Sequence, residues 1–165
     1  MPNSISRSDS ATGVAERIDY AYDGNLVTGE TISGTVNGSL TWTYDSDFAV
    51  RSLSINGGPA ITFTYDNDKS LTAAGTETLT RNTSNGLLTG TTLGTVTDSY
   101  TYDTFGAPSR YTAKAGGAAI FDVQYTRDGL GRISRKVETI GGVATTYDYT
   151  YDLAGRLTGV SGELV

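Results

Sequence analysis

A Tyr-Asp pair recurs along this chain at nearly regular intervals. The second residue of the pair is Asp23, Asp45, Asp66, Asp103 or Asp152, and the same spacing is continued by Asn82 and Asp128, each of which follows an Arg. We call these seven positions the rungs. They are separated by 22, 21, 16, 21, 25 and 24 residues. A fixed period of about 20 to 50 residues is typical of repeat proteins, in which each repeat is one supersecondary unit.

The residues before each rung alternate between large apolar side chains and small polar ones. The segments Leu40-Thr-Trp-Thr-Tyr44 and Ile61-Thr-Phe-Thr-Tyr65 are clear examples. Alternation with a period of two is typical of a half-buried β-strand, and we expect the Tyr side chains of successive repeats to pack into one continuous core. The composition agrees, because the chain contains 21 Gly and 11 Tyr among 165 residues, whereas charged residues make up only 18%. We therefore expect an all-β chain with little helix.

A turn and a second strand are expected after each rung. The rung side chain is suited to accept hydrogen bonds from backbone N–H groups two residues on. Gly stands three residues after the last three rungs, where a positive φ is favoured, but Phe48, Lys69 and Asn85 stand there after three others. Because Lys and Phe adopt a positive φ poorly, we expect their turns to have a different geometry.

Glycine-rich segments are expected to reverse the chain after each second strand. They are Asn37-Gly38, Asn56-Gly57-Gly58-Pro59, Gly116-Gly117 and Gly141-Gly142. Asn-Gly between alternating segments is a strong hairpin signal. The sequence thus predicts tandem β-hairpins in one continuous curved antiparallel sheet of about fourteen strands. Seven repeats would occupy residues 18–165, the last one truncated, after a flexible lead-in at residues 1–17; the shortest hairpin would precede Asn82.

The motif Tyr-Asp-x-x-Gly-Arg-Leu, complete at residues 151–157 and nearly so at 127–133, resembles the YD repeat of the Rhs (rearrangement hotspot) family. That family includes bacterial polymorphic toxins, C components of insecticidal toxin complexes, wall-associated proteins and teneurins. The resemblance implies part of a longer array in a secreted or cell-surface protein, forming a spiral shell or an extended stalk. The matching residues, expected to be structural, are Tyr22, Asp23, Tyr44, Asp45, Tyr65, Asp66, Tyr102, Asp103, Asp128, Gly131, Arg132, Tyr151, Asp152, Gly155 and Arg156.

A structural role is what the resemblance implies: a non-catalytic shell segment that encloses or presents a cargo or toxin domain. Its partners would be flanking repeats or that cargo. The residues favour the same role, because acid–base pairs need carboxylates in unequal surroundings, whereas the rungs recur in equivalent ones. Without His or Cys, the chain lacks the commonest general base and thiolate metal ligands. We expect no enzyme and no cofactor, and we expect Arg132 and Arg156 to pair with Asp128 or Asp152.

Two other functions stay open from the sequence. Trp42 and the aromatic rows are suited to stacking on sugars, which would make the chain an adhesive or carbohydrate-binding module. Open sheet edges are templates for further strands, which would make it a homo-oligomer or a self-assembling filament. Calcium also stays open at Asp45-Ser-Asp47 and Asp66-Asn-Asp68, although the twelve-residue calcium-loop pattern is absent.

Charge and hydropathy argue against two classes of partner. The formal net charge of −6 opposes binding to phosphate backbones, so we expect no nucleic-acid partner. The chain has no apolar run near the roughly 20 residues that a membrane-spanning helix needs. Its first ten residues also lack the apolar segment of a signal peptide.

Overall fold

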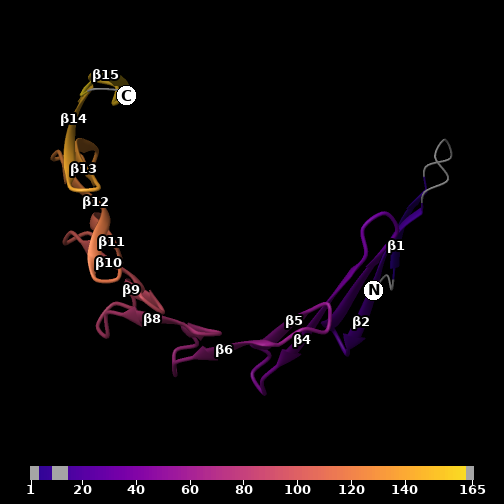
Figure 1. Cartoon of the computed structure of the whole chain (residues 1–165). Helices are drawn as coiled ribbons and strands as arrows, with labels where there is room; N and C mark the ends of the chain where they lie inside the picture. The colour runs from indigo at the N-terminus through magenta and orange to yellow at the C-terminus, as the bar shows by residue number, and fades with distance from the viewer. Residues whose placement is uncertain (1–3, 9–14, 163–165) are drawn as a thin grey trace. The chain divides into compact units, whose positions relative to one another are not determined.

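The computed structural model describes residues 4–8 and 15–162, and these residues form fifteen β-strands and no helix (Figure 1). The chain divides into two compact units, residues 1–75 and 76–165. Unit 1 contains β1 (Ser4–Ser8), β2 (Ala15–Asp23), β3 (Leu26–Ser33), β4 (Gly38–Tyr44), β5 (Val50–Ile55), β6 (Ile61–Tyr65) and β7 (Leu71–Ala74). Unit 2 contains β8 (Glu77–Arg81), β9 (Leu88–Leu93), β10 (Val96–Tyr102), β11 (Pro108–Ala115), β12 (Ala118–Arg127), β13 (Ile133–Ile140), β14 (Val143–Tyr151) and β15 (Leu157–Ser161).

Within each unit, every described strand pairs antiparallel with its neighbours in sequence. The all-β, antiparallel hairpin prediction is therefore confirmed. The lead-in expected at residues 1–17 contains a strand, because β1 pairs with β2 and β2 already begins at Ala15. That strand has one apolar residue, Ile5, and so no visible alternation. Residues 1–3 and 9–14 lie outside the described part, and the division into seven repeats stays a prediction.

Five rungs open the same turn: Asp45, Asp66, Asp103, Asp128 and Asp152. In each, the rung N–H donates to the carbonyl four residues on. The N–H three residues on donates back to the rung carbonyl, and all these bonds measure 2.9–3.1 Å. This pattern is a three-residue hairpin loop whose last residue has a positive φ.

The expectation that Phe48 and Lys69 give a different turn is wrong. Their φ angles are 64° and 62°, and their turns form the same two backbone bonds as the glycine turns. The bonds around the rung impose the conformation on the residue, and the Phe48 side chain, 71% exposed, extends into solvent. The Asn82 turn does differ, since it is one residue longer and has its positive φ at Gly86.

Phe48→Gly is expected to raise the free energy of unfolding by about 1 kcal/mol, because the left-handed conformation costs a non-glycine residue about 1–2 kcal/mol. A urea titration followed by circular dichroism measures the change. Gly106→Ala is the matched control, because Gly106 holds the same turn position with a φ of 81° and should lose stability. A loss of stability in Phe48→Gly would show that the turn stores no strain.

Two of the expected glycine reversals are tight two-residue hairpins. Gly116-Gly117 joins Ala115 to its partner Ala118, and the φ angles of the two glycines are 57° and 84°. Gly141-Gly142 is alike, with φ angles of 57° and 86°. The reversal expected at Asn37-Gly38 lies slightly earlier, because Gly38 already begins β4 and the Asn37 side chain closes the loop by bonding to Gly34.

The shortest hairpin was expected before Asn82, and the strands described in that interval are short. With four residues, β7 is the shortest strand described, and β8 has five. The boundary between the two units falls directly after β7, at Gly75.

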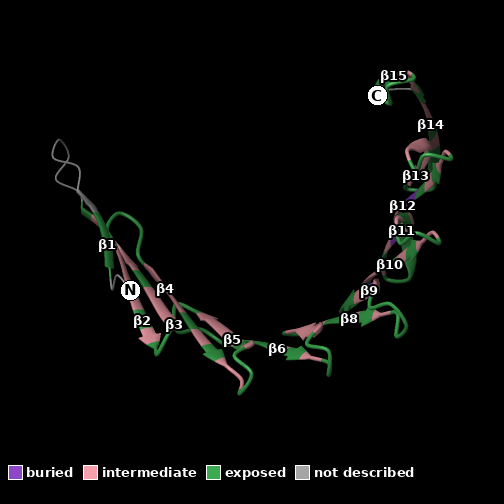
Figure 2. Ribbon diagram, turned by 180° about the vertical axis from the view of Figure 1, so that it is seen from behind, coloured by how far each residue is buried: buried purple, intermediate pink, exposed green. Residues whose placement is uncertain are grey.

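Neither unit has a core of its own among the described residues. Strands contact only their sequence neighbours within a unit, so each unit is a single layer. Val123 is the one buried apolar side chain in the described part of the chain, and Figure 2 shows mostly half-buried and exposed residues. The expectation that the Tyr side chains form a continuous packed core is therefore wrong: they are half-buried, because no second layer within the unit covers their face.

Candidate functional site

The rung carboxylates cap their own turns. At Asp45, Asp66, Asp103 and Asp128, Oδ1 accepts the backbone N–H groups two and four residues on, at 2.9–3.0 Å. Asp152 accepts the N–H of Arg156 at 2.9 Å, and Asn82 accepts that of Ser84 at 2.8 Å. Asp23 instead ends β2 at a tight turn that contains Gly24, whose φ is 57°.

A β-bulge precedes every rung. The register shifts by one residue immediately before Tyr22, Tyr44, Tyr65, Arg81, Tyr102, Arg127 and Tyr151. The extra residue lies in the second strand of the repeat and is Ser or Thr in six of the seven cases, for example Thr72, Ser109 and Thr158. The hydroxyls of these three residues hydrogen-bond to the hydroxyl of the Thr that stands two residues before the rung, at 2.9–3.1 Å. Bulges of this kind bend a strand and increase its local twist.

The Tyr hydroxyl before a rung donates to a backbone carbonyl of the preceding repeat. Tyr44 donates to Val27 at 2.6 Å, Tyr65 to Val50 at 2.8 Å, Tyr102 to Leu88 at 2.7 Å and Tyr151 to Ile133 at 2.8 Å. In every case the acceptor carbonyl belongs to the residue that pairs, across the hairpin of the preceding repeat, with the Tyr or Arg that stands directly before that repeat's rung. We call this contact the inter-repeat bond. Tyr22, half-buried on β2, is the first residue of the series.

Arg127 replaces Tyr at its rung and keeps the inter-repeat bond. Its Nη2 donates to the carbonyl of Pro108 at 3.1 Å, and Pro108 is the residue that pairs with Tyr102 one rung earlier. Its Nε also lies 3.7 Å from Asp103 Oδ2, and its Nη1 donates to the carbonyl of Gly131 at 3.3 Å. The guanidinium group therefore donates the inter-repeat bond in place of a Tyr hydroxyl, and it also contacts the Asp103 turn and the Asp128 turn.

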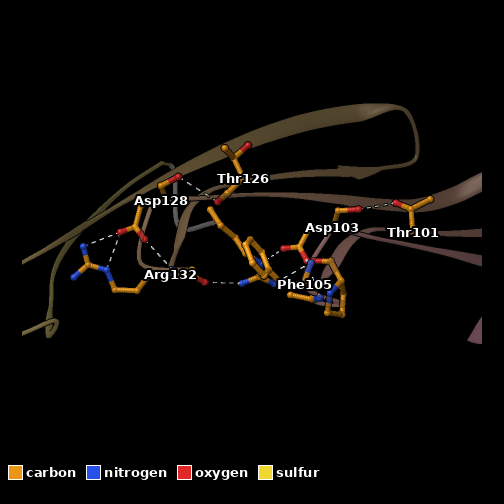
Figure 3. A network of polar contacts seen from close by, with 12 residues as sticks. Thr101, Asp103, Phe105, Thr126, Asp128 and Arg132 are labelled. Atoms are coloured by element: carbon orange, nitrogen blue, oxygen red, sulfur yellow. Dashed lines mark hydrogen bonds and ion pairs between the residues drawn. The ribbon is translucent and has the colours of Figure 1, made fainter. Parts of the chain in front are cut away.

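Arg132 and Arg156, each following the turn glycine Gly131 or Gly155, pair with the carboxylate of their own turn. The Nε atom of Arg132 donates to Asp128 Oδ2 at 2.7 Å, as Figure 3 shows, and that of Arg156 donates to Asp152 Oδ2 at 2.8 Å. The Arg132 guanidinium also lies 4.4 Å from the centre of the Tyr151 ring, one rung further on. Such a cation–π contact contributes about 0.5–1 kcal/mol at exposed sites.

Hydrogen bonds of this kind lower the pKa of three rung carboxyls, those of Asp45, Asp128 and Asp152. The pKa of Asp128 lies below its usual value, chiefly because of the bond from the Arg132 side chain. The pKa of Asp152 is also lowered, chiefly by the backbone N–H of Arg156 and then by its side chain. For Asp45 the backbone N–H of Ala49 is the largest cause of a lowered pKa.

Stability is expected to fall as the pH drops below about 4. A carboxyl whose folded pKa is lowered stabilises the folded chain above its unfolded pKa of about 3.9, and this contribution is lost as the pH falls through the folded pKa. Urea titrations between pH 6 and pH 2.5 measure the change. In Asp128→Asn the decline should be shallower than in wild type. An identical pH dependence in the variant would contradict the assignment to Asp128.

Two polar clusters away from the rungs were not expected from the sequence. Asp122 on β12, 8% exposed, accepts Arg110 Nε at 2.8 Å and the Thr112 hydroxyl at 2.6 Å, both from β11. On the opposite face, the Tyr100 hydroxyl bonds to Asp98 at 3.3 Å, and burial raises the pKa of Tyr100. The Asp122 cluster depends on the pairing register of β11 and β12, which local sequence patterns do not specify, whereas Tyr100 and Asp98 both lie on β10.

The two acidic segments considered for calcium are occupied by other contacts. Oδ1 of Asp45 and of Asp66 accepts N–H groups of its own turn, and Asp47 pairs with Lys69. In the part of the chain that the structure describes, no group of three or more His, Cys, Asp or Glu residues is placed to hold a metal ion. The described residues also contain no helix long and apolar enough to cross a membrane.

Trp42 is half-buried on β4 and lines a shallow hollow of about 450 Å³ in unit 1. Tyr20 and Glu30 also line it, together with Ser39 and Thr41 of the same strand as Trp42. An aromatic ring beside hydroxyl and carboxyl groups is a combination that suits a sugar.

Comparisons with known proteins agree with this geometry. A chain in the crystal structure of TcdB2-TccC3-Cdc42 matches 90% of this chain with a TM-score of 0.73 and 15% identity. A chain in the Tc holotoxin pore of Photorhabdus luminescens, which carries a TccC3 variant, also matches 90% of this chain, with a TM-score of 0.71 and 15% identity. The chain spans only 9% of the length of each of these two. These likenesses show a shared fold.

No curated protein matches the chain significantly. The family model described as the teneurin YD-shell, however, matches residues 4–164. That match covers every rung, the bulge before it and each inter-repeat bond described above. The chain therefore belongs to the teneurin YD-shell family.

Proposed function

We propose that the chain is a non-catalytic wall segment of a larger β-sheet shell that encloses or presents a cargo. The observation that carries the proposal is the inter-repeat bond. The polar group of Tyr44, Tyr65, Tyr102, Arg127 and Tyr151 is in each case used to tie one repeat to the preceding one. The rung carboxylates are likewise used within their turns, so the recurring residues serve the wall itself.

The single-layer architecture supports the same role. Among the residues that the structure describes, the half-buried Tyr face has no covering layer within its own unit. In a shell, repeats gain stability from their neighbours and from the contents they enclose. The partners that we propose are flanking repeats and an enclosed cargo domain of the parent protein, which would be secreted or displayed at the cell surface.

A chimaeric shell tests this proposal. The segment of a TccC3-containing shell that superposes on this chain is replaced by residues 4–162, and protection of the enclosed part from added protease is measured. We expect the chimaera to assemble and to keep its contents protected. The matched control carries Phe at Tyr44, Tyr65, Tyr102 and Tyr151, and should leak. A wild-type chimaera that assembles but leaves its contents open to protease would contradict a wall function.

A second candidate function, carbohydrate binding, is favoured by the hollow beside Trp42. Because Trp42 is the single Trp of the chain, its fluorescence reports directly on a sugar bound there. Titration with a panel of neutral and acidic oligosaccharides should change the emission if the site binds sugar, and Trp42→Phe provides the matched control for stacking. If no member of the panel changes the emission, carbohydrate binding beside Trp42 is contradicted and the wall function is the proposal that remains.

A further inference from the structure

We propose that Tyr100 and Tyr111 form a covalent modification site, at which oxidation by a peroxidase joins the two rings through a carbon–carbon bond into dityrosine. Tyr100 lies on β10 and pairs directly with Tyr111 on β11. The chain contains no cysteine, so no disulfide can join these two strands. The inference goes beyond the wall function and does not depend on it, because it concerns a link within one hairpin.

The two rings are placed close enough to couple. Their centres lie 4.9 Å apart, with 46° between the ring planes. This separation is near the short end of the range of about 4.5–7 Å that aromatic pairs adopt. The rings of Tyr20 and Tyr22, in contrast, lie 6.3 Å apart and belong to a single strand. The close approach of Tyr100 and Tyr111 follows from the backbone register, which sets the two residues opposite each other.

One carboxylate, that of Asp98, draws both phenol groups toward the same point. The Tyr100 hydroxyl donates to Asp98 Oδ2 at 3.3 Å. Burial raises the pKa of Tyr111, and the charge of Asp98 and a hydrogen bond to it raise this pKa further. Both phenol oxygens therefore lie at the same carboxylate. The ortho carbons are the ring atoms next to the carbon that carries the hydroxyl, so the atoms that would couple lie on the converging sides of the two rings.

Asp98 also gives this pair a chemistry that the Tyr residues of the inter-repeat bonds lack. Their hydroxyls donate to backbone carbonyls, which are not bases. The Asp98 carboxylate can take up the phenolic proton as an electron leaves the ring, as a general base does. Tyr111 also contacts Phe121, with 6.0 Å between the ring centres. A phenyl ring has no hydroxyl and forms no phenoxyl radical, so coupling of Tyr111 is directed toward Tyr100.

The reaction balances with hydrogen peroxide as the oxidant and a haem peroxidase as the catalyst. Each phenol loses one electron and one proton and becomes a phenoxyl radical. The two radicals form one bond between their ortho carbons, and the hydrogen on each of these carbons then moves to the oxygen of its own ring. Two hydrogen atoms leave in all, and they reduce one hydrogen peroxide to two water molecules. The product keeps both hydroxyls and closes the hairpin between residues 100 and 111 covalently.

Oxidation of the full-length chain with a haem peroxidase and hydrogen peroxide tests the site. Trypsin cuts after Arg81, Arg110 and Lys114, which places the two tyrosines in separate peptides, residues 82–110 and 111–114. Mass spectrometry should find these peptides joined, with their summed mass reduced by two hydrogen atoms. Their yield should not change on about tenfold dilution of the chain, because two rings in one hairpin have a fixed effective concentration. A yield that falls with dilution would show coupling between chains and contradict the site.

Three variants, each checked for folding by circular dichroism, identify the groups involved. Tyr100→Phe should abolish the joined peptides, whereas Tyr102→Phe, on the same strand and in the same tryptic peptide, should keep them. Asp98→Asn removes the base and should slow the joining about tenfold. An unchanged rate in that variant would contradict the role of the carboxylate.

The site itself is contradicted if the wild-type chain yields no joined peptides, if Tyr100→Phe retains them, or if Tyr102→Phe loses them. None of these outcomes changes the protease protection measured in the chimaera. The cross-link and the wall function therefore fail independently.

Discussion

Replacing Tyr102 by alanine is expected to lower the free energy of unfolding by about 2–4 kcal/mol. The ring is half-buried, so its loss should cost less than the roughly 3–5 kcal/mol of a fully buried aromatic ring. To this is added the bond to the Leu88 carbonyl, about 1 kcal/mol. A urea titration followed by circular dichroism measures the total.

Tyr102→Phe separates the two contributions, because it removes only the hydroxyl. We expect a loss of about 1 kcal/mol in this variant. If Tyr102→Ala cost no more than Tyr102→Phe, the ring would contribute nothing and the packing of the Tyr face would have no role in stability. If Tyr102→Phe were neutral, the inter-repeat bond would be a contact without energetic weight.

Gly90→Ala is the second substitution with a large expected effect, a loss of about 1–3 kcal/mol. Gly90 is buried on β9, and a Cβ there would lie 2.5 Å from the carbonyl oxygen of Asp98. Because that oxygen belongs to the backbone of β10, the two strands must move apart. Differential scanning calorimetry or urea titration measures the loss.

Gly159→Ala is the matched control for this steric effect. Gly159 and Gly90 each follow the bulge residue of their own repeat. Gly159 pairs with Thr150, and Gly90 pairs with the equivalent residue, Thr80. A Cβ at Gly159 would meet the Thr150 hydroxyl at 3.0 Å, and that side chain can rotate away. We expect a loss below about 1 kcal/mol. Equal losses in the two variants would rule out the Asp98 backbone contact as the cause.

The strands and the Asp turns could be predicted because their determinants are local. Alternation in segments such as 40–44 and 61–65 predicts strands directly, and an Asp followed three residues later by Gly predicts a turn. The Phe48 turn shows how far the local rule extends. The capping bonds of Asp45 enforce a positive φ even on Phe48, a residue that adopts this conformation poorly. The rung carboxylate therefore determines the turn, and a glycine at the same position only lowers the conformational strain.

The inter-repeat bond could not be predicted, because it depends on register between strands that the sequence does not align. Tyr151 and the Ile133 carbonyl are 18 residues apart, and the bulge before each rung decides which carbonyl faces the hydroxyl. The sequence has Arg127 where most repeats have Tyr, yet Arg127 keeps the inter-repeat bond by donating to the Pro108 carbonyl. Asp122 is inconspicuous for the same reason, since its partners lie on the neighbouring strand.

The expectation of a core failed for a different physical reason. Period-two alternation shows that one face of a strand is suited to burial, but it does not show whether the covering layer lies in the same chain. In both units the covering layer is absent among the described residues.

The central claim is that the inter-repeat bond ties each repeat to the preceding one. Removing four of the Tyr hydroxyls together tests this claim most directly. The chain with Phe at Tyr44, Tyr65, Tyr102 and Tyr151 keeps every ring and loses only the bonds to Val27, Val50, Leu88 and Ile133. Its free energy of unfolding in urea should fall by about 4 kcal/mol, close to the sum of four single losses. A value within about 0.5 kcal/mol of wild type would contradict the inter-repeat bond as the tie between repeats.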